Sequence, residues 1–264
     1  MSFQPHTPIR SLLKGLSVGT LVLGHLGLSL LPSQAAFLGR VAEFGARLTF
    51  PPTQDLGSPS RSTGGGTRGG ECIAEGEEVP IQAIVPPVSH NRTVDTTPEL
   101  VVYVGNTSAA ALEMRMFDAG FNLVGPDTPY RVSLDGRKNG LVTVPLLPEE
   151  FTLEPGKRYR WSVMLVCDVS SSDRAGDPFD LGELEVVSLG NQEQAELDQL
   201  QGLAKAERSL ENLLGYDTLT IAAGLHNSDP DTWKELVSSL RLDDKARAAI
   251  TEACFLDGES ATCE

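Results

Sequence analysis

The chain has 264 residues, with 36 Asp and Glu residues against 21 Lys and Arg residues, and a formal charge of −15. This length fits one large domain or two modest ones. Binding of nucleic acid or of anionic lipid depends on neutralising phosphates with Lys and Arg, so the charge argues against both as partners. The composition is otherwise that of an ordinary globular protein, and it excludes wholesale disorder.

Residues 1–35 have the pattern of a secretory signal peptide. Arg10 and Lys14 precede an apolar run over residues 15–31, and a proline and a small-x-small sequence then lead to Ala35. We therefore predict cleavage after Ala35 and a mature protein in the periplasm, the cell envelope or the medium, without stable membrane insertion. The alternative is an uncleaved anchor, although the run is short for a bilayer and no basic residues follow it.

The four cysteines indicate disulfides once export is assumed. An even number of cysteines normally pairs in an oxidising compartment, and four allow three connectivities. We favour Cys72–Cys167 and Cys254–Cys263. A zinc site is a weaker alternative, because the chain has no Cys-x-x-Cys pair.

Residues 36–71 are predicted to be a flexible segment, because most of them are Pro, Gly, Ser and other residues with little apolar surface to bury. Residues 72–189 then show short apolar runs separated by turn residues, which is typical of an all-β domain. We predict an immunoglobulin-like antiparallel β-sandwich here and an α+β chain overall. The expected strands are 79–85, 99–104, 112–118, 121–124, 130–134, 141–145, 156–168 and 181–187.

The segment 156–168 has the clearest pattern of these strands. Alternation with period two divides its side chains between two faces, as in a long central strand. The apolar face carries Tyr159, Trp161, Val163, Leu165 and Cys167, and the opposite face carries Arg158, Arg160 and Ser162.

Residues 190–264 are predicted to be a small helical region, because the apolar spacing changes to three and four residues. A first helix is expected from about Asn191 to Leu214, with Gly215 as the residue that ends it. The others are expected over 217–225, from Asp229-Pro230 onward, and from Asp243 to Cys254.

Four groups of residues follow one another in a recognisable order: the glycine-rich residues 64–68 with Cys72, residues 81–86, residues 157–161 leading to Cys167-Asp168, and residues 174–177. In this order they resemble the cyanobacterial domain of unknown function 928 family, over about residues 50–253. The resemblance implies an exported cyanobacterial protein and brings no assigned activity.

The loop after the central strand is the best candidate metal site. Asp168, Asp173, Asp177 and Asp180 bring four carboxylates within a short segment, and calcium prefers six to eight oxygen ligands. The alternative is a polar loop whose Asp residues bond to their own backbone. Outside this loop, His90 and His226 are expected to be surface residues.

The mature chain contains no catalytic motif, and we therefore predict a protein that is not an enzyme and needs no cofactor. The first hypothesis is an exported, non-catalytic binding or assembly module with an unknown partner in the cell envelope. A calcium-stabilised adhesion-type domain that uses residues 168–180 is the first alternative. An unrecognised enzyme is the second, and it requires a deep pocket with convergent polar groups.

Overall fold

The computed structural model describes residues 48–51, 72–134, 139–243, 245, 248–252, 254–257 and 260–263, and from residue 252 onward it describes the backbone alone. The predicted signal peptide and most of the segment 36–71 lie outside these residues. Within the described ranges the chain forms two β-sheets and a group of helices, which makes it an α+β protein.

The smaller sheet has four strands and the larger sheet has eight. In the small sheet, the order is β1 (Ile81–Ile84), β3 (Glu99–Val104), β7 (Gly140–Pro145) and β10 (Ala249–Glu252). In the large sheet, the order is β12 (Ser260–Cys263), β11 (Cys254–Asp257), β6 (Tyr130–Ser133), β4 (Ala111–Asp118), β8 (Arg158–Val166), β9 (Phe179–Val186) and β2 (Arg92–Thr93), with β5 (Leu123–Val124) paired to β4.

The main hydrophobic core lies between the two sheets. Alternate residues of β3 and β7 point into it from the small sheet, and alternate residues of β4 and β8 point into it from the large sheet. The predicted apolar face of β8 is buried, since Tyr159, Trp161, Val163 and Leu165 are at most 3% exposed. The pattern of this strand was therefore sufficient to predict its two faces.

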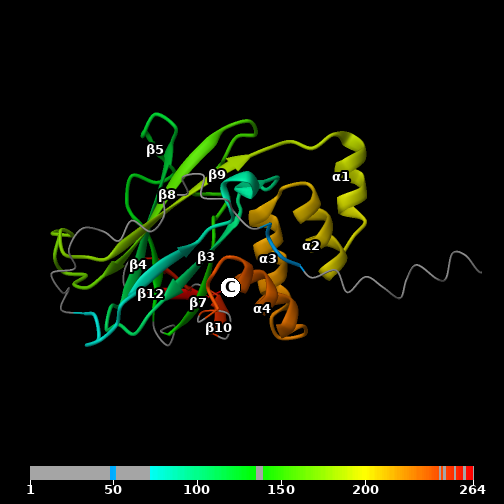
Figure 1. The fold of residues 1–264 in the computed structure, drawn as a ribbon. Helices are drawn as coiled ribbons and strands as arrows, with labels where there is room; N and C mark the ends of the chain where they lie inside the picture. The colour runs from blue at the N-terminus through cyan, green and yellow to red at the C-terminus, as the bar shows by residue number, and fades with distance from the viewer. Residues whose placement is uncertain are drawn as a thin grey trace, which may run out of the picture. The chain divides into compact units, whose positions relative to one another are not determined.

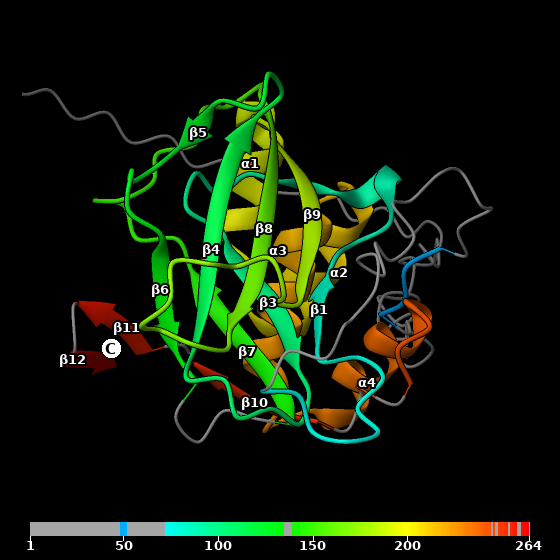
Figure 2. The same cartoon turned by 90° about the vertical axis from the view of Figure 1, so that its left-hand side faces the viewer.

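The second face of the small sheet is covered by helices, so this sheet is buried on both sides. Val101 and Leu141 pack against helical residues such as Leu219 and Trp233 in a second core. In Figure 1 these helices lie on one side of the sheets, and in Figure 2 α1, α2 and α3 lie behind the strands while α4 lies at the lower right. The helices are α1 (Asn191–Asp198), α2 (Gly202–Glu211), α3 (Gly215–Leu225) and α4 (Pro230–Ser239).

The helix predictions are partly right. α4 begins as predicted, because the carboxylate of Asp229 accepts a hydrogen bond from the backbone N–H of Thr232. The predicted first helix is instead two helices, and Gly215 begins α3 rather than ending the helix before it. A side chain at Gly215 would collide with the carbonyl of His90, which explains the glycine there.

The helix predicted from Asp243 to Cys254 is wrong. Residues 249–252 form β10, which pairs in parallel with β7 at the edge of the small sheet. Strand pairing has overridden the local helix preference of this segment. In addition, β11 and β12 extend the large sheet, so the C-terminal region is not purely helical.

The expected strands are present with small shifts at their ends, but an immunoglobulin-like arrangement is not confirmed. Two pairs, β10 with β7 and β2 with β9, are parallel, and one sheet is covered by helices. The continuous apolar runs of β3 and β7 indicated burial on both faces, a signal that the prediction of a two-layer sandwich missed.

Two residues outside the sheets also differ from expectation. His90, at the end of the 3-10 helix Val88–His90, is buried and packs edge-on against the ring of Phe50. It was predicted to lie on the surface, and burial lowers the pKa of its imidazole. Leu48 and Phe50 belong to the predicted flexible segment, yet both are buried in the helical core.

The central strand is tied to the helices through Trp161. Its indole N–H donates to the Tyr216 hydroxyl at 3.1 Å, and that hydroxyl donates to the carbonyl of Glu183 at 2.8 Å. A side chain at Gly182 would collide with the indole ring, so only glycine lets β9 approach it this closely. This contact fixes α3 against β8 and β9.

Within the described ranges, no helix combines the length and the apolar character required to cross a bilayer.

Candidate functional site

The face of the large sheet that points away from the helices is the best candidate site. We call it the outer face, and Figure 2 views it directly. Its side chains form cross-strand rows according to the strand register. They are Glu113, Arg115 and Phe117 of β4, Arg158, Arg160, Ser162 and Met164 of β8, and Phe179, Leu181, Glu183 and Glu185 of β9.

Two rows of this face hold cross-strand ion pairs. Nε of Arg158 lies 3.3 Å from a carboxylate oxygen of Glu185, and Nε of Arg160 lies 2.7 Å from one of Glu183. Exposed pairs of this kind contribute only about 0–1 kcal/mol to stability. They therefore shape the chemistry of the surface more than they hold the fold together.

A cavity of about 300 Å³ opens beside these pairs. We call it the arginine groove, and its volume is at the lower end for a small-ligand site. The charged side chains that line it are Arg92, Arg158, Arg160, Glu183 and Glu185, with Val88, Asn91, Ala119, Tyr159 and Leu184 completing the wall.

Phe121 stands next to this groove in an unusual conformation. Its side chain is 70% exposed, and its φ is +63° in the turn that connects β4 to β5. A left-handed backbone at a residue other than glycine costs roughly 1–2 kcal/mol. The guanidinium of Arg160 lies 4.5 Å from the centre of the ring, a cation–π contact that offsets part of this cost.

The four predicted calcium ligands do not converge. Asp168 accepts hydrogen bonds from the backbone and side chain of Ser170, and these bonds lower its pKa. Asp173 accepts from the backbone of Ala175. Asp180 accepts from the backbone N–H of Ala83 in β1, and so joins the edges of the two sheets. Among the described residues, no three His, Cys, Asp or Glu side chains are placed to hold a metal ion.

The loop contains a cation of its own, which is Arg174. Its Nη1 donates to the carbonyl oxygens of Asp168 and Ser171 at 3.0 and 2.8 Å, and the carbonyl of Asp173 lies 3.5 Å away. Backbone carbonyls that a calcium ion could use are therefore bound by a guanidinium. The arrangement agrees with the alternative of a polar loop that is satisfied by its own groups.

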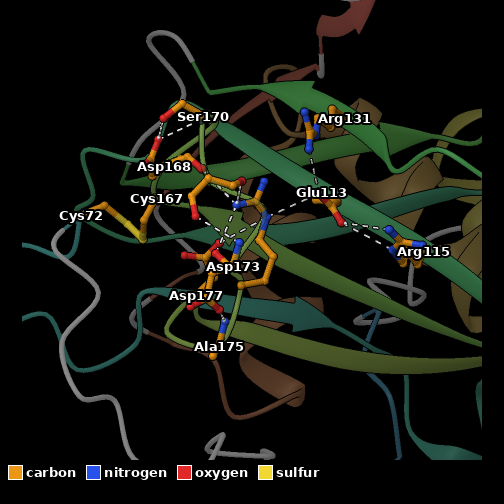
Figure 3. Close-up of polar contacts among 12 residues, drawn as sticks. Cys72, Glu113, Arg115, Arg131, Cys167, Asp168, Ser170, Asp173, Ala175 and Asp177 are labelled. Atoms are coloured by element: carbon orange, nitrogen blue, oxygen red, sulfur yellow. Dashed lines mark hydrogen bonds and ion pairs between the residues drawn. A yellow bond between two sulfur atoms is a disulfide. The ribbon is translucent and has the colours of Figure 1, made fainter.

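Arg174 also joins the loop to a charge cluster on the outer face (Figure 3). Glu113 is 5% exposed and lies within 3.4 Å of both Arg115 and Arg131, and 3.8 Å from Arg174. Asp177 lies 3.6 Å from Arg174, and burial raises its pKa although a hydrogen bond from Cys167 and the guanidinium of Arg174 act against it. The cluster pairs buried carboxylates with arginines, which is a structural role.

The Cys72–Cys167 disulfide lies beside this cluster. Cys72 precedes the small sheet and Cys167 follows β8, so the bond joins the two sheets across 95 residues of sequence. The predicted Cys254–Cys263 bond lies outside the side chains that the structure describes. The backbone register places these two residues opposite each other on β11 and β12.

A second cavity, of about 450 Å³, lies between the helices and the end of β2. Asp217, in the first turn of α3, lines it and accepts a hydrogen bond from the backbone of Val94 at 3.3 Å. Burial raises the pKa of Asp217 to about 6, and the charge of Asp95 acts in the same direction. The carboxylate is already used to anchor the helix, so we assign it a structural role.

Arg158 and Arg160 were predictable from the sequence as the polar face of a strand, but the groove was not. Arg92 comes from a distant strand, and its contribution depends on the parallel pairing of β2 with β9. The position of Phe121 could have been noticed in the sequence, because it lies in a turn position that glycine or asparagine normally fills. Nothing in the sequence indicated the cluster around Glu113, because the arginines that surround it come from three separate segments.

Comparisons with known proteins identify a family but no activity. No match to a curated protein or to a solved structure was found. The family model described as Domain of Unknown Function (DUF928) matches residues 63–250, which include, among the described residues, β1 to β9, the start of β10 and the helices α1 to α4. The chain therefore belongs to the DUF928 family.

Proposed function

We propose that this protein is an exported, non-catalytic binding or assembly module of the cell envelope. The observation that carries the proposal is the outer face of the large sheet. It displays Phe179 and Leu181, each 42% exposed, together with Phe121 and the two arginines of β8. Exposed apolar side chains that are surrounded by polar groups are typical of interaction surfaces.

The other faces of the two sheets are buried within the protein. The inner face of the large sheet and one face of the small sheet form the main core, and the helices cover the remaining face. This division leaves the outer face as the broad sheet surface with no helix or second sheet on it in the described part of the chain, and only the loop after β8 covers the area around Glu113 (Figure 2). We infer that a partner binds there.

Export is supported by the signal-like residues 1–35 and by the disulfide between Cys72 and Cys167. Disulfides persist mainly in oxidising compartments. The non-catalytic role is supported by the engagement of the buried charged groups, because Glu113, Asp177 and Asp217 all have structural partners.

The experiment compares the full-length protein with two variants in the producing cell. Phe179→Asp combined with Leu181→Asp changes the outer face, and Glu207→Lys changes a partly exposed position on α2 as a control. We expect the first variant to be exported but to lose its association with the envelope fraction at least tenfold, while the control retains it. Retention by both variants, or a wild-type protein that remains in the cytosol, would contradict the proposal.

A further inference from the structure

The arginine groove contains hydrogen-bond donors that the fold does not use. Arg158 and Arg160 each donate only through Nε, to Glu185 and Glu183. Their Nη groups make no hydrogen bond with any described residue, and Arg92 makes no ion pair with one. Three guanidinium groups with free donors therefore line the same cavity of about 300 Å³.

Free guanidinium donors favour an oxyanion. An arginine presents its N–H groups as a planar fork, which matches the two oxygens of a carboxylate. On a chain with a formal charge of −15, a cavity lined by three arginines and two glutamates is a local exception to the acidic surface. The groove therefore suits a ligand that carries a carboxylate.

The glutamates restrict the class of ligand. Glu183 and Glu185 are 48% and 27% exposed at the side chain, and each has oxygens that can accept further hydrogen bonds. A densely charged polyanion would be repelled by these two carboxylates. A ligand with one carboxylate per ring and several hydroxyl groups would instead use the arginines as donors to its carboxylate and the glutamates as acceptors from its hydroxyls.

Phe121 supplies the third element of recognition. One face of its ring is held by Arg160, and the side chain is 70% exposed at the edge of the groove. The fold maintains this exposed ring on a left-handed backbone, and strain of this kind is concentrated at functional sites. An exposed aromatic ring offers a flat surface on which the C–H face of a sugar ring can pack.

The position of the groove argues against an acidic peptide. A peptide usually adds to a sheet edge, where it pairs with free backbone groups. The groove is instead lined mainly by β8 and β9, which are paired with each other along this stretch, from Arg158 opposite Glu185 to Arg160 opposite Glu183, and it reaches the sheet edge only at Arg92 of the two-residue strand β2. Recognition must therefore come from side chains.

We propose that the arginine groove and Phe121 form a binding site for an acidic saccharide built of uronic acid units. The carboxylate of one unit binds the Nη groups of Arg158 and Arg160, its hydroxyls bind Glu183 and Glu185, and a neighbouring ring packs on Phe121. This inference rests on the proposed function, for which it names the class of ligand.

The test is calorimetric titration of the full-length protein with a trimer of galacturonic acid. The neutral galactose trimer and a penta-glutamate peptide are titrated in parallel. We expect the galacturonate trimer to bind and the other two probes to bind at least tenfold more weakly. We also expect its affinity to fall as salt is raised, because the contact is electrostatic.

Three variants locate the site. Arg160→Gln and Arg158→Gln each remove a fork and are expected to weaken binding roughly tenfold or more, the usual effect of losing a charged hydrogen bond. Phe121→Gly removes the ring and places glycine at a position with a φ of +63°, so it should weaken binding without loss of thermal stability. Arg208→Gln, on α2, is the charge-matched control and should bind as the wild type does.

Two results would overturn the inference. Failure of the galacturonate trimer to bind at millimolar concentration would exclude the saccharide, and tighter binding of penta-glutamate would assign the groove to a peptide. If envelope association persists in either case, the ligand class is wrong and the proposed function stands. If the outer-face variants also retain envelope association, the proposed function itself fails.

Discussion

The two sheets of this protein differ in what covers them, although they share one core. The small sheet has apolar residues on both faces, with Val101 and Leu141 packed against the helices. The large sheet has Trp161 and Val163 on its inner face and arginines on its outer face. The small sheet is therefore a layer buried on both faces, whereas the large sheet has one face in the core and one face toward solvent.

The largest difference in stability is expected when one apolar residue of each sheet is replaced by aspartate. Val101→Asp places a charge without a partner between the small sheet and the helices, and should destabilise the protein by about 3–5 kcal/mol. Leu181→Asp, on the outer face, should change the free energy of unfolding by no more than about 0.5 kcal/mol. Urea unfolding measures both, and similar losses would mean that the outer face is also a packed surface.

The link between the sheets gives the next largest effect. Replacing Cys72 and Cys167 together by alanine opens a connection across 95 residues and should cost roughly 2–5 kcal/mol. Urea unfolding of this variant is compared with that of wild-type protein that has been reduced. If neither differs from the oxidised wild type, the two sheets are held together by their core alone.

The anchoring of the helices to the sheets can be tested through pH. Because the pKa of Asp217 is about 6 in the folded protein and about 3.8 ordinarily, its protonated form favours folding. This contribution is complete below about pH 3.8 and is lost as the pH rises through about 6. Asp217→Asn should therefore gain stability relative to the wild type between pH 4 and pH 7.5, by on the order of 2 kcal/mol.

The measurement is urea unfolding of both proteins at the two pH values. Asp127→Asn, at an exposed loop position, serves as the matched control and should follow the wild type at both. If Asp217→Asn also follows the wild type, the carboxylate of Asp217 titrates like an exposed one, and its placement against β2 is wrong.

The smallest effect is expected for calcium. Because Arg174 binds the carbonyls of residues 168 and 171, millimolar calcium should not change the melting temperature. Thermal melts with calcium and with a chelator measure this directly. A calcium-dependent increase that Asp173→Asn and Asp177→Asn abolish would restore the loop as a calcium site.

Local pattern was enough to predict most elements of the large sheet. The alternation of residues 158–166 identified the inner and outer faces of β8, and Asp229-Pro230 marked the start of α4. The sequence pattern led to wrong predictions where contacts with distant residues determine the local structure. Residues 249–252 have a sequence suited to a helix but pair with β7, and Gly215 is required by the carbonyl of His90, a contact across more than a hundred residues.

The candidate site was predictable only in part for the same reason. Arg158 and Arg160 followed from one strand, whereas Arg92 joins them through the pairing of β2 with β9. The carboxylates of residues 168–180 are close in sequence, yet each bonds to a different group. Whether that loop binds calcium stays a prediction to be tested, and no local sequence pattern indicated the groove.

We propose that partners bind the outer face of the large sheet, and site-specific photocrosslinking in the producing cell is a direct test of this binding. A photoreactive residue is placed at Leu181 on β9 in one protein and at Glu207 on α2 in the other. We predict discrete crosslinked products from position 181 that disappear when Arg158 and Arg160 are changed to Gln, and none from position 207. Crosslinks from position 207 alone would contradict the account and assign binding to the helices.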